Sequence, residues 1–394
     1  MGGIVNGSKR PLPDSGKIHP MSHIPAAAST RPIWDVFCRV IDNLGDIGVC
    51  WRFCAHLAQR GQSVRLWIDA PEALAWMAPG ALQGEVAHVE VQHWTKTLAA
   101  ELLSERPPAD VWVEAFGCDP ADEWMAWLAQ RVAEGHPQPV WLNLEYMSAE
   151  SYVERCHRLP SPIFTGPLSG LTKWFFYPGF TPATGGLLRE ADLMERRNRF
   201  DATEWLQTHH LPSDTSRRRI SLFCYEPPPL QQVLGEVTAE TPSSAWLVTH
   251  GRAAQAVAQL PAEATFLSEM HRLHPLTQTD FDHLLWSCDL NFVRGEDSLV
   301  RALWAGQPFV WHIYPQHDNA HHAKLEAFLE WLQAPTSLRT FHRLWNGVQP
   351  MEGSVWPGWE VVDSWKPCAL AARSRLLAQP DLVTQLLEFV AKKR

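Results

Sequence analysis

The sequence lacks the features that mark a membrane-spanning protein, a secreted protein or a duplex nucleic-acid binder. No apolar run approaches the ~20 residues that cross a bilayer, and no signal-peptide core stands near the start. Lys and Arg form no long run and the formal net charge is -9, so the basic footprint of a nucleic-acid-binding protein is missing. We therefore expect neither a membrane nor a nucleic acid as partner. A partner with a basic or mixed face fits better.

Cysteine and histidine also fail to form the usual motifs. The 8 cysteines include no CxxC pair, and several stand inside apolar strand patterns, where cysteine behaves as a small hydrophobe. This pattern is typical of a reduced compartment and predicts a cytoplasmic protein. His317, His321 and His322 include a pair with metal-ligand spacing, but no third ligand of the HExxH kind accompanies them. We interpret them as a solvated helix start after Pro315.

Length and composition indicate an ordinary globular chain with two domains. The chain has 394 residues, of which 45% are hydrophobic and 20% charged, and domains average roughly 150 residues. Residues 1–20 are polar and aperiodic, and Met21 follows them. We interpret 1–20 as a leader outside the fold and expect the natural start at Met21.

Strand and helix patterns alternate in the amino-terminal half. The expected strands are 34–40, 64–68, 89–91, 111–116 and 140–144, and a helix is expected over 124–132. Such alternation is typical of a parallel sheet covered by helices on both faces. We predict a Rossmann-like domain over 21–212.

The same alternation returns after a linker at 211–216, which follows a Pro-, Gly- and aromatic-rich stretch (160–186) and an expected charged helix (189–206). The second set of expected strands is 220–224, 246–249, 264–267, 289–293 and 309–313. We predict a second Rossmann-like domain over 213–365 and a helical segment over 366–394, which ends in an Asp-capped amphipathic helix at 381–393. Two Rossmann-like domains facing across a cleft form the GT-B glycosyltransferase architecture, although other α/β enzymes share it.

One strand-to-helix loop of the first half carries two acids and two glycines, Asp42, Gly45, Asp46 and Gly48. Such loops open at the carboxyl ends of parallel strands, where ligands bind, and glycine lets the backbone come close to a ligand. If Asp46 begins the helix, the helix dipole favours its charged form, which suits a carboxylate that accepts a proton or holds a cation. The alternative is that Asp46 is only an N-cap. Asp42 cannot cap the same helix.

A loop of the second half, Arg294 to Ser298, lies between an expected strand and a helix expected over 299–305. Gly295 and Ser298 offer free N–H groups and a hydroxyl to a phosphate, and Arg294 adds a charged donor. A nucleoside diphosphate would fit there, whereas the glycine spacing matches neither a dinucleotide motif nor a P-loop. Glu296 and Asp297 would bond to hydroxyls of a sugar or ribose. The alternative is a capped helix with an Arg–Asp surface pair.

Two more polar or aromatic residues, Tyr225 and Gln278, stand at other strand-end loops of the second half. Each could contact a base, and each alone is also compatible with ordinary packing or a solvent contact.

With both loops considered, the chain resembles the elongation factor P arginine rhamnosyltransferases, the EarP family. These enzymes transfer L-rhamnose from dTDP-β-L-rhamnose to one arginine of translation elongation factor P. The segments that carry the resemblance are 37–52, 141–146, 185–190, 281–285, and 294–302 continuing to 312–316.

The resemblance implies an inverting, metal-independent GT-B enzyme that needs no cofactor, with the acceptor on the first half and the nucleotide on the second. The two aspartates of the family fall on Asp42 and Asp46, and its glutamate falls on Glu296. Its contacts to the nucleotide sugar fall on Asn43, Leu44, Gly45, Phe223, Tyr225, Gln278, Arg294, Gly295, Asp297 and Ser298. One position departs from the family pattern, since Pro275 stands where relatives carry an aromatic residue.

The implied chemistry needs carboxylates because a guanidinium is a poor nucleophile whose pKa exceeds ~12. One carboxylate can grip the guanidinium while another accepts its proton. We assign the base to Asp46, the orienting role to Asp42, and support of the sugar to Glu296. Alternatives are a GT-B enzyme for a glycan or lipid acceptor and a non-catalytic module that binds the elongation factor.

Overall fold

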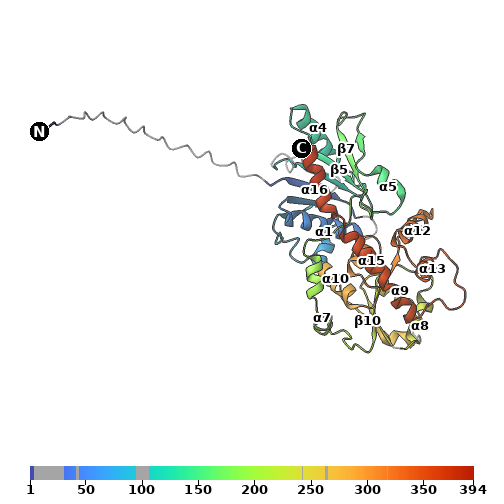
Figure 1. The fold of residues 1–394 in the computed structure, drawn as a ribbon. Coiled ribbons are helices and arrows are strands. Elements are labelled where there is room, and N and C mark those ends of the chain that lie inside the picture. Colours follow the sequence, from blue (N-terminus) through green and yellow to red (C-terminus); the bar gives the residue numbers. More distant parts are fainter. Residues whose placement is uncertain (4–30, 41–43, 95–105, 242, 262–264, 317) are drawn as a thin grey trace. The chain divides into compact units, whose positions relative to one another are not determined.

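Two parallel β-sheets, one in each half of the chain, organise residues 32–394 (Figure 1). The computed structural model describes residues 1–3, 31–40, 44–94, 106–241, 243–261, 265–316 and 318–394. Most of the predicted leader, together with Asp42, Asn43 and His317, lies outside the described residues.

The first sheet has the strand order β3-β2-β1-β4-β5-β7-β6, in which only β6 runs antiparallel to its neighbour. Its strands are β1 (Ile33–Cys38), β2 (Ser63–Ile68), β3 (Val89–His93), β4 (Val111–Ala115), β5 (Val140–Leu144), β6 (Pro160–Pro162) and β7 (Thr172–Phe176). The helices of this half are α1 (Gly45–Gln59), η1 (Pro71–Ala73), α2 (Leu74–Met77), α4 (Asp122–Ala133) and α5 (Ser151–Cys156). All the strands expected for this half are confirmed, and β6 and β7 were missed.

Tryptophan fills much of the space beside one face of this sheet, which explains part of the unusual count of 20 in the chain. Trp67 of β2 and Trp112 of β4, the strands on either side of β1, both meet Trp124 of α4 edge to face, with ring centroids 4.8 and 5.7 Å apart. Phe37 of β1 contacts the same rings. Edge-to-face packing of large rings fixes the distance between helix and sheet.

The second sheet has the order β10-β9-β8-β11-β12 and its strands are all parallel. Its strands are β8 (Arg218–Leu222), β9 (Ser244–Val248), β10 (Met270–Arg272), β11 (Leu290–Arg294) and β12 (Phe309–His312). The helices around it are α8 (Leu230–Thr238), α9 (Arg252–Ala258), η2 (Thr265–Glu269), α10 (Gln278–Ser287), α11 (Asp297–Ala305), α12 (Ala320–Leu332), α13 (Thr336–Trp345) and α14 (Trp359–Asp363). The predicted α/β class with two Rossmann-like halves is confirmed.

Two secondary-structure predictions are wrong. The strand expected over 264–267 is the short helix η2 from Thr265, and the edge strand β10 follows it. The single helix expected over 189–206 is two helices, α6 (Leu193–Arg199) and α7 (Ala202–Thr208). The helical pattern is interrupted at Asp201, which adopts an extended conformation and caps α7 by accepting the Thr203 N–H at 2.8 Å.

The packing of α6 and α7 also bears on where the halves meet. Leu193 of α6 belongs to the main core of the second sheet, and Trp205 and Leu206 of α7 pack with Leu247 of β9. Both helices therefore pack with the second half, although they precede the predicted boundary at 212.

The end of the chain connects the two halves. Helix α15 (Lys366–Leu377) packs in the core of the second sheet, while α16 (Leu382–Lys393) lies on the first half, with Leu386 and Phe389 in the same core as Trp34 (Figure 1). The predicted Asp cap of α16 is present, since Asp381 accepts the Thr384 N–H at 3.0 Å.

No described helix is both long and apolar enough to span a bilayer. The cysteines all lie in the described part of the chain, and each is a free thiol.

Because α16 supplies core side chains to the first half, we expect Leu386→Ala to lower the free energy of unfolding by about 2–5 kcal/mol. Leu386 is fully buried, whereas Glu388 on the same helix is exposed. Glu388→Ala is therefore the matched control and should change stability by less than about 0.5 kcal/mol. Urea unfolding of both variants measures the difference, and equal losses would contradict the packing described.

Candidate active site

Hydrogen bonds within the loop between β11 and α11, and one from Trp311 of β12, hold that loop in place. The Ser298 hydroxyl accepts the Arg294 N–H at 3.0 Å and donates to the Arg294 carbonyl, and the Trp311 indole donates to the Gly295 carbonyl at 2.7 Å. Gly295 has φ +66°, a conformation that favours glycine. Helix α11 begins at Asp297, earlier than the predicted start at 299.

The Arg294 guanidinium lies between two aromatic rings that follow β8. Its central carbon is 4.5 Å from the Phe223 ring centroid and 4.7 Å from that of Tyr225, and it donates to the Cys224 carbonyl at 3.2 Å. Such cation–π contacts hold a cation in a fixed orientation. Burial raises the pKa of Tyr225 to about 12, against the lowering effect of Arg294. The structure thus brings together three of the residues predicted to bind the nucleotide sugar.

The predicted base, Asp46, lies in the first turn of α1 and is buried. The N-cap position is taken by the exposed Leu44, so the alternative in which Asp46 is only an N-cap is wrong. The Tyr146 hydroxyl donates to Asp46 Oδ1 at 3.4 Å, and the Tyr146 ring stacks on Phe116 with centroids 4.6 Å apart. Burial first, and then the negative charge of Asp46, raise the pKa of Tyr146, so its hydroxyl keeps its proton.

The predicted sugar-supporting acid, Glu296, reaches across to the first half of the chain. One carboxylate oxygen accepts the Met147 N–H at 2.9 Å, and the other pairs with Lys324 Nζ at 2.6 Å. Asp46 and Glu296, which come from opposite halves, therefore contact the neighbouring residues Tyr146 and Met147. The short loop after β5 therefore donates a hydrogen bond to each of the two acids.

Two further residues predicted to bind the nucleotide sugar, Gln278 and Asp297, contact α1 directly. The Gln278 amide donates to the Gly48 carbonyl at 2.8 Å, and Asp297 accepts from Arg52 Nε at 3.3 Å. A Cβ added at Gly48 would lie 3.3 Å from Gln278 Nε2. Gly48 was predicted to admit a ligand, and the close neighbour that the structure shows there is a side chain of the other half.

The alternative for the Arg294–Ser298 loop, a surface Arg–Asp pair, does not match the contacts of the described residues. Arg294 lies between aromatic rings, and Asp297 pairs with Arg52. The proposed Asp42 and Asn43 contacts lie outside the described residues and stay predictions.

Comparison with known proteins decides the family. A family profile described as "Elongation-Factor P (EF-P) rhamnosyltransferase EarP" matches residues 34–391. The chain belongs to the EarP family.

Relatives of known name support this membership. The protein-arginine rhamnosyltransferase of Pseudomonas aeruginosa is 42% identical over 386 residues, which cover 91% of this chain and 98% of the relative. That of Shewanella oneidensis is 35% identical over 407 residues, covering 93% and 100%. The resemblance predicted from the sequence is confirmed, and the chain is an enzyme of the EarP glycosyltransferase family.

Solved structures support the architecture. The structure described as "Structural basis for EarP-mediated arginine glycosylation of translation elongation factor EF-P" matches with a TM-score of 0.57 and 28% identity, covering 92% of this chain and 100% of that chain. The spinosyn rhamnosyltransferase SpnG matches with a TM-score of 0.51 and 13% identity, covering 92% and 100%, which shows the fold alone. The GT-B architecture is confirmed.

Three residues of this EarP-family site escaped the sequence analysis, namely Arg52, Tyr146 and Lys324. Tyr146 could have been found, because it lies two residues after the end of an expected strand, where side chains of a parallel sheet reach the ligand site. Arg52 lies inside the segment that carries the resemblance, but nothing local to it indicates its partners.

The structure can be compared with the metal-ligand spacing of the histidines at the start of α12. Among the residues that the structure describes, no group of three or more His, Cys, Asp or Glu side chains could hold a metal ion. His321 lies at the start of α12, where its Nδ1 accepts the Gln316 N–H at 3.1 Å. This contact fits the predicted helix start, but the prediction of a solvated position is wrong for His321, whose side chain is buried.

If the β11–α11 loop belongs to the active site, its glycine conformation should matter for activity. Gly295→Ala should lower stability by about 1 kcal/mol through backbone strain, and its new methyl group would stand 3.4 Å from the Tyr225 hydroxyl. Gly353 has nearly the same φ, +67°, and open space around it, so Gly353→Ala is a matched control for strain. We expect similar unfolding energies but reduced transferase activity in Gly295→Ala alone. Equal activities would contradict the assignment of this loop to the site.

Proposed function

We propose that the chain transfers L-rhamnose from dTDP-β-L-rhamnose to an arginine side chain of translation elongation factor P, with inversion at the anomeric carbon. The observation that carries the proposal is the direct contact of α1, which carries Asp46 in its first turn, with Gln278 and Asp297 of the second half. An acid able to take a proton and a loop able to hold a diphosphate are thereby joined in one site. The names of the relatives support the sugar, the arginine and the elongation factor.

On the donor side, the Arg294 guanidinium and the amides at the start of α11 would hold the diphosphate. Burial lowers the pKa of Arg294, but a guanidinium stays protonated near neutral pH. Because these groups are fixed before the reaction, they can stabilise the negative charge that develops on the leaving diphosphate without a metal ion. The Ser298 hydroxyl, which donates to the Arg294 carbonyl, would donate to the diphosphate in place of that bond.

On the acceptor side, Asp46 would take a proton from the guanidinium while a guanidinium nitrogen bonds to the anomeric carbon. The bond from that carbon to the diphosphate breaks, and the diphosphate leaves with the electron pair. Asp42 would grip the guanidinium, and Tyr146 would orient the Asp46 carboxylate through its hydrogen bond. Glu296, held by Lys324 and the Met147 N–H, would support the positive charge that develops on the sugar ring.

Mass spectrometry of elongation factor P, incubated with dTDP-β-L-rhamnose and the enzyme in EDTA, tests the function. We expect a mass gain of one deoxyhexose on one arginine. Donor hydrolysis with an unmodified elongation factor would contradict the acceptor, and activity that returns only with magnesium or manganese would contradict the metal-free mechanism. The cytoplasmic location stays a prediction.

The division of labour between the halves can be tested by donor binding. Arg294→Ala removes a charged contact to the diphosphate and should weaken donor affinity by about one to two decades, since such a contact contributes roughly 1.5–3 kcal/mol. Asp42→Ala should leave donor affinity nearly unchanged because Asp42 is assigned to the acceptor. Calorimetric titration of both variants measures the difference. Equal losses of donor affinity in the two variants would contradict the assignment of donor and acceptor to opposite halves.

The role of Asp46 is tested by Asp46→Asn, which keeps size and hydrogen bonding but removes the charge. Loss of a general base lowers the rate by ~10²–10⁴, while donor affinity should change little. Turnover and donor binding should be measured on the same variant, with circular dichroism to show that α1 is intact. Near-normal turnover in Asp46→Asn with a dead Asp42→Asn would reverse the two roles.

A further inference from the structure

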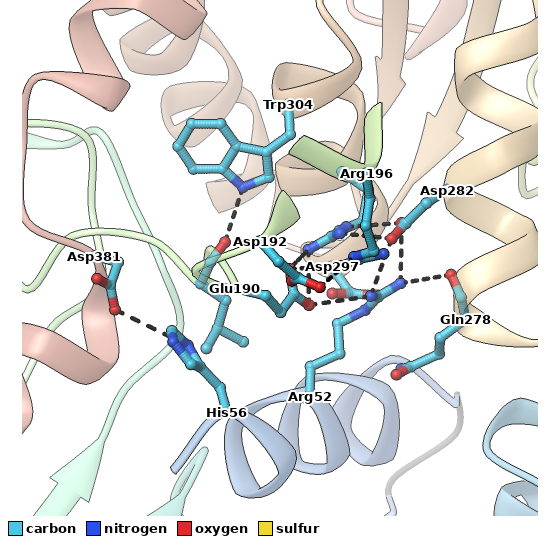
Figure 2. A network of polar contacts seen from close by, with 12 residues as sticks. Arg52, His56, Glu190, Asp192, Arg196, Gln278, Asp282, Asp297, Trp304 and Asp381 are labelled. Atoms are coloured by element: carbon cyan, nitrogen blue, oxygen red, sulfur yellow. Dashed lines mark hydrogen bonds and ion pairs between the residues drawn. The ribbon is translucent and has the colours of Figure 1, made fainter. Parts of the chain in front are cut away.

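A buried ionic network lies where α1 meets the second half, beside the first residues of α10 and α11 (Figure 2). Its members are Arg52, Glu190, Asp282, Asp297 and Arg301. Asp282 is shared by both arginines, at 3.1 Å from Arg52 Nη2 and 2.8 Å from Arg301 Nε. Of these five residues, only Asp297 is among those predicted to bind the nucleotide sugar.

Glu190 and Arg301 stabilise each other in their charged forms. Burial would raise the pKa of Glu190, but Arg301 and Arg52 outweigh it and hold that pKa well below its usual range. The carboxylates Asp282 and Glu190 in turn raise the pKa of Arg301 against the effect of its burial. The Glu190–Arg301 pair therefore stays charged through the neutral pH range and does not act as a pH switch.

The two arginines differ in what else they contact. Arg301 bonds to Asp282 and Glu190. Arg52 bonds to the same two acids and also donates to the Gln278 main-chain carbonyl at 3.0 Å and to Asp297 at 3.3 Å. Gln278 and Asp297 are two of the residues predicted to bind the nucleotide sugar. Figure 2 shows the Arg52 side chain extending from α1 toward both.

Arg52 also lies on the helix that carries the proposed base. Asp46 precedes it by about 9 Å along the axis of α1, at 1.5 Å per residue. One turn before Arg52, the Gly48 carbonyl accepts a hydrogen bond from the Gln278 side-chain amide. The helix thus holds Gln278 at both its main chain and its side chain, so any shift of α1 moves Asp46 relative to the donor loops.

We propose that Arg52 is a positioning residue that fixes the proposed base Asp46 relative to Gln278 and Asp297, and so aligns the acceptor side with the nucleotide sugar. This inference rests on the proposed function. The planar fork of arginine can donate in several directions at once, whereas lysine is a compact point charge that cannot reproduce that geometry. A misplacement of about 1 Å in an active site can lower the rate by about 10²-fold.

Arg52→Lys and Arg301→Lys form a matched pair for the test, because both keep one positive charge in the same buried network. Thermal unfolding, calorimetric binding of dTDP, and kcat and KM for rhamnosylation of elongation factor P should be measured on both. We expect both to lose stability. Only Arg52→Lys should lower kcat by about 10- to 100-fold and weaken dTDP binding by about tenfold. Equal effects of the two variants on kcat and on dTDP binding would overturn the inference and leave Arg52 a structural residue.

A second pair covers the case in which a lysine variant does not fold. Two double variants each remove one positive and one negative charge. One combines Arg52→Gln with Asp282→Asn, and the other combines Arg301→Gln with Asp282→Asn. The same difference in kcat and dTDP binding is expected between these double variants, and its absence overturns the inference. A wild-type enzyme that leaves elongation factor P unmodified would contradict the proposed function. An active wild type with indistinguishable variants would contradict the role of Arg52 alone.

Discussion

The contact on which the site depends is the docking of the first two turns of α1 against the second half of the chain. Gly48 lets Gln278 approach the helix backbone, and Arg52 bonds to the main chain of the same residue. Asp46 lies on α1 itself, and Gln278 and Asp297, at the starts of α10 and α11, contact α1 directly. A GT-B enzyme must hold groups from two domains in one geometry, and here a helix of one half does so.

A buried ionic network is a costly way to make such a contact. Removing charges from water carries a large penalty, and replacing buried ion pairs by apolar side chains often leaves stability unchanged or improves it. What the pairs provide is direction, because each hydrogen bond requires a defined angle and distance. Arg52 and Arg301 sharing Asp282 therefore make sense as a device for orientation rather than for stability.

Local patterns predicted most of the fold, because the central strands of both sheets are buried and read as short apolar runs between helical patterns. The exceptions have local physical causes: Asp201 caps a new helix inside an otherwise helical pattern, and β7 lies in a stretch whose Pro and Gly content masked its apolar residues. The sequence placed Tyr225 and Arg294 at strand ends of the same half, and the structure shows the two side chains in contact. The network of Arg52 could not be predicted, since its partners Asp282 and Asp297 stand 230 and 245 residues away in the sequence.

The central claim is that the acceptor and the diphosphate are held by opposite halves, so that the attacking nitrogen and the leaving oxygen lie on opposite faces of the sugar ring. Asp46 on α1 and Arg294 at the end of β11 would define those two sides. The most direct measurement is the anomeric configuration of the rhamnosyl–arginine product, determined by NMR on modified elongation factor P made from the β-configured donor. A single displacement across the site predicts an α-linked product. A β-linked product would require two displacements or attack from the diphosphate side, and would contradict the arrangement described.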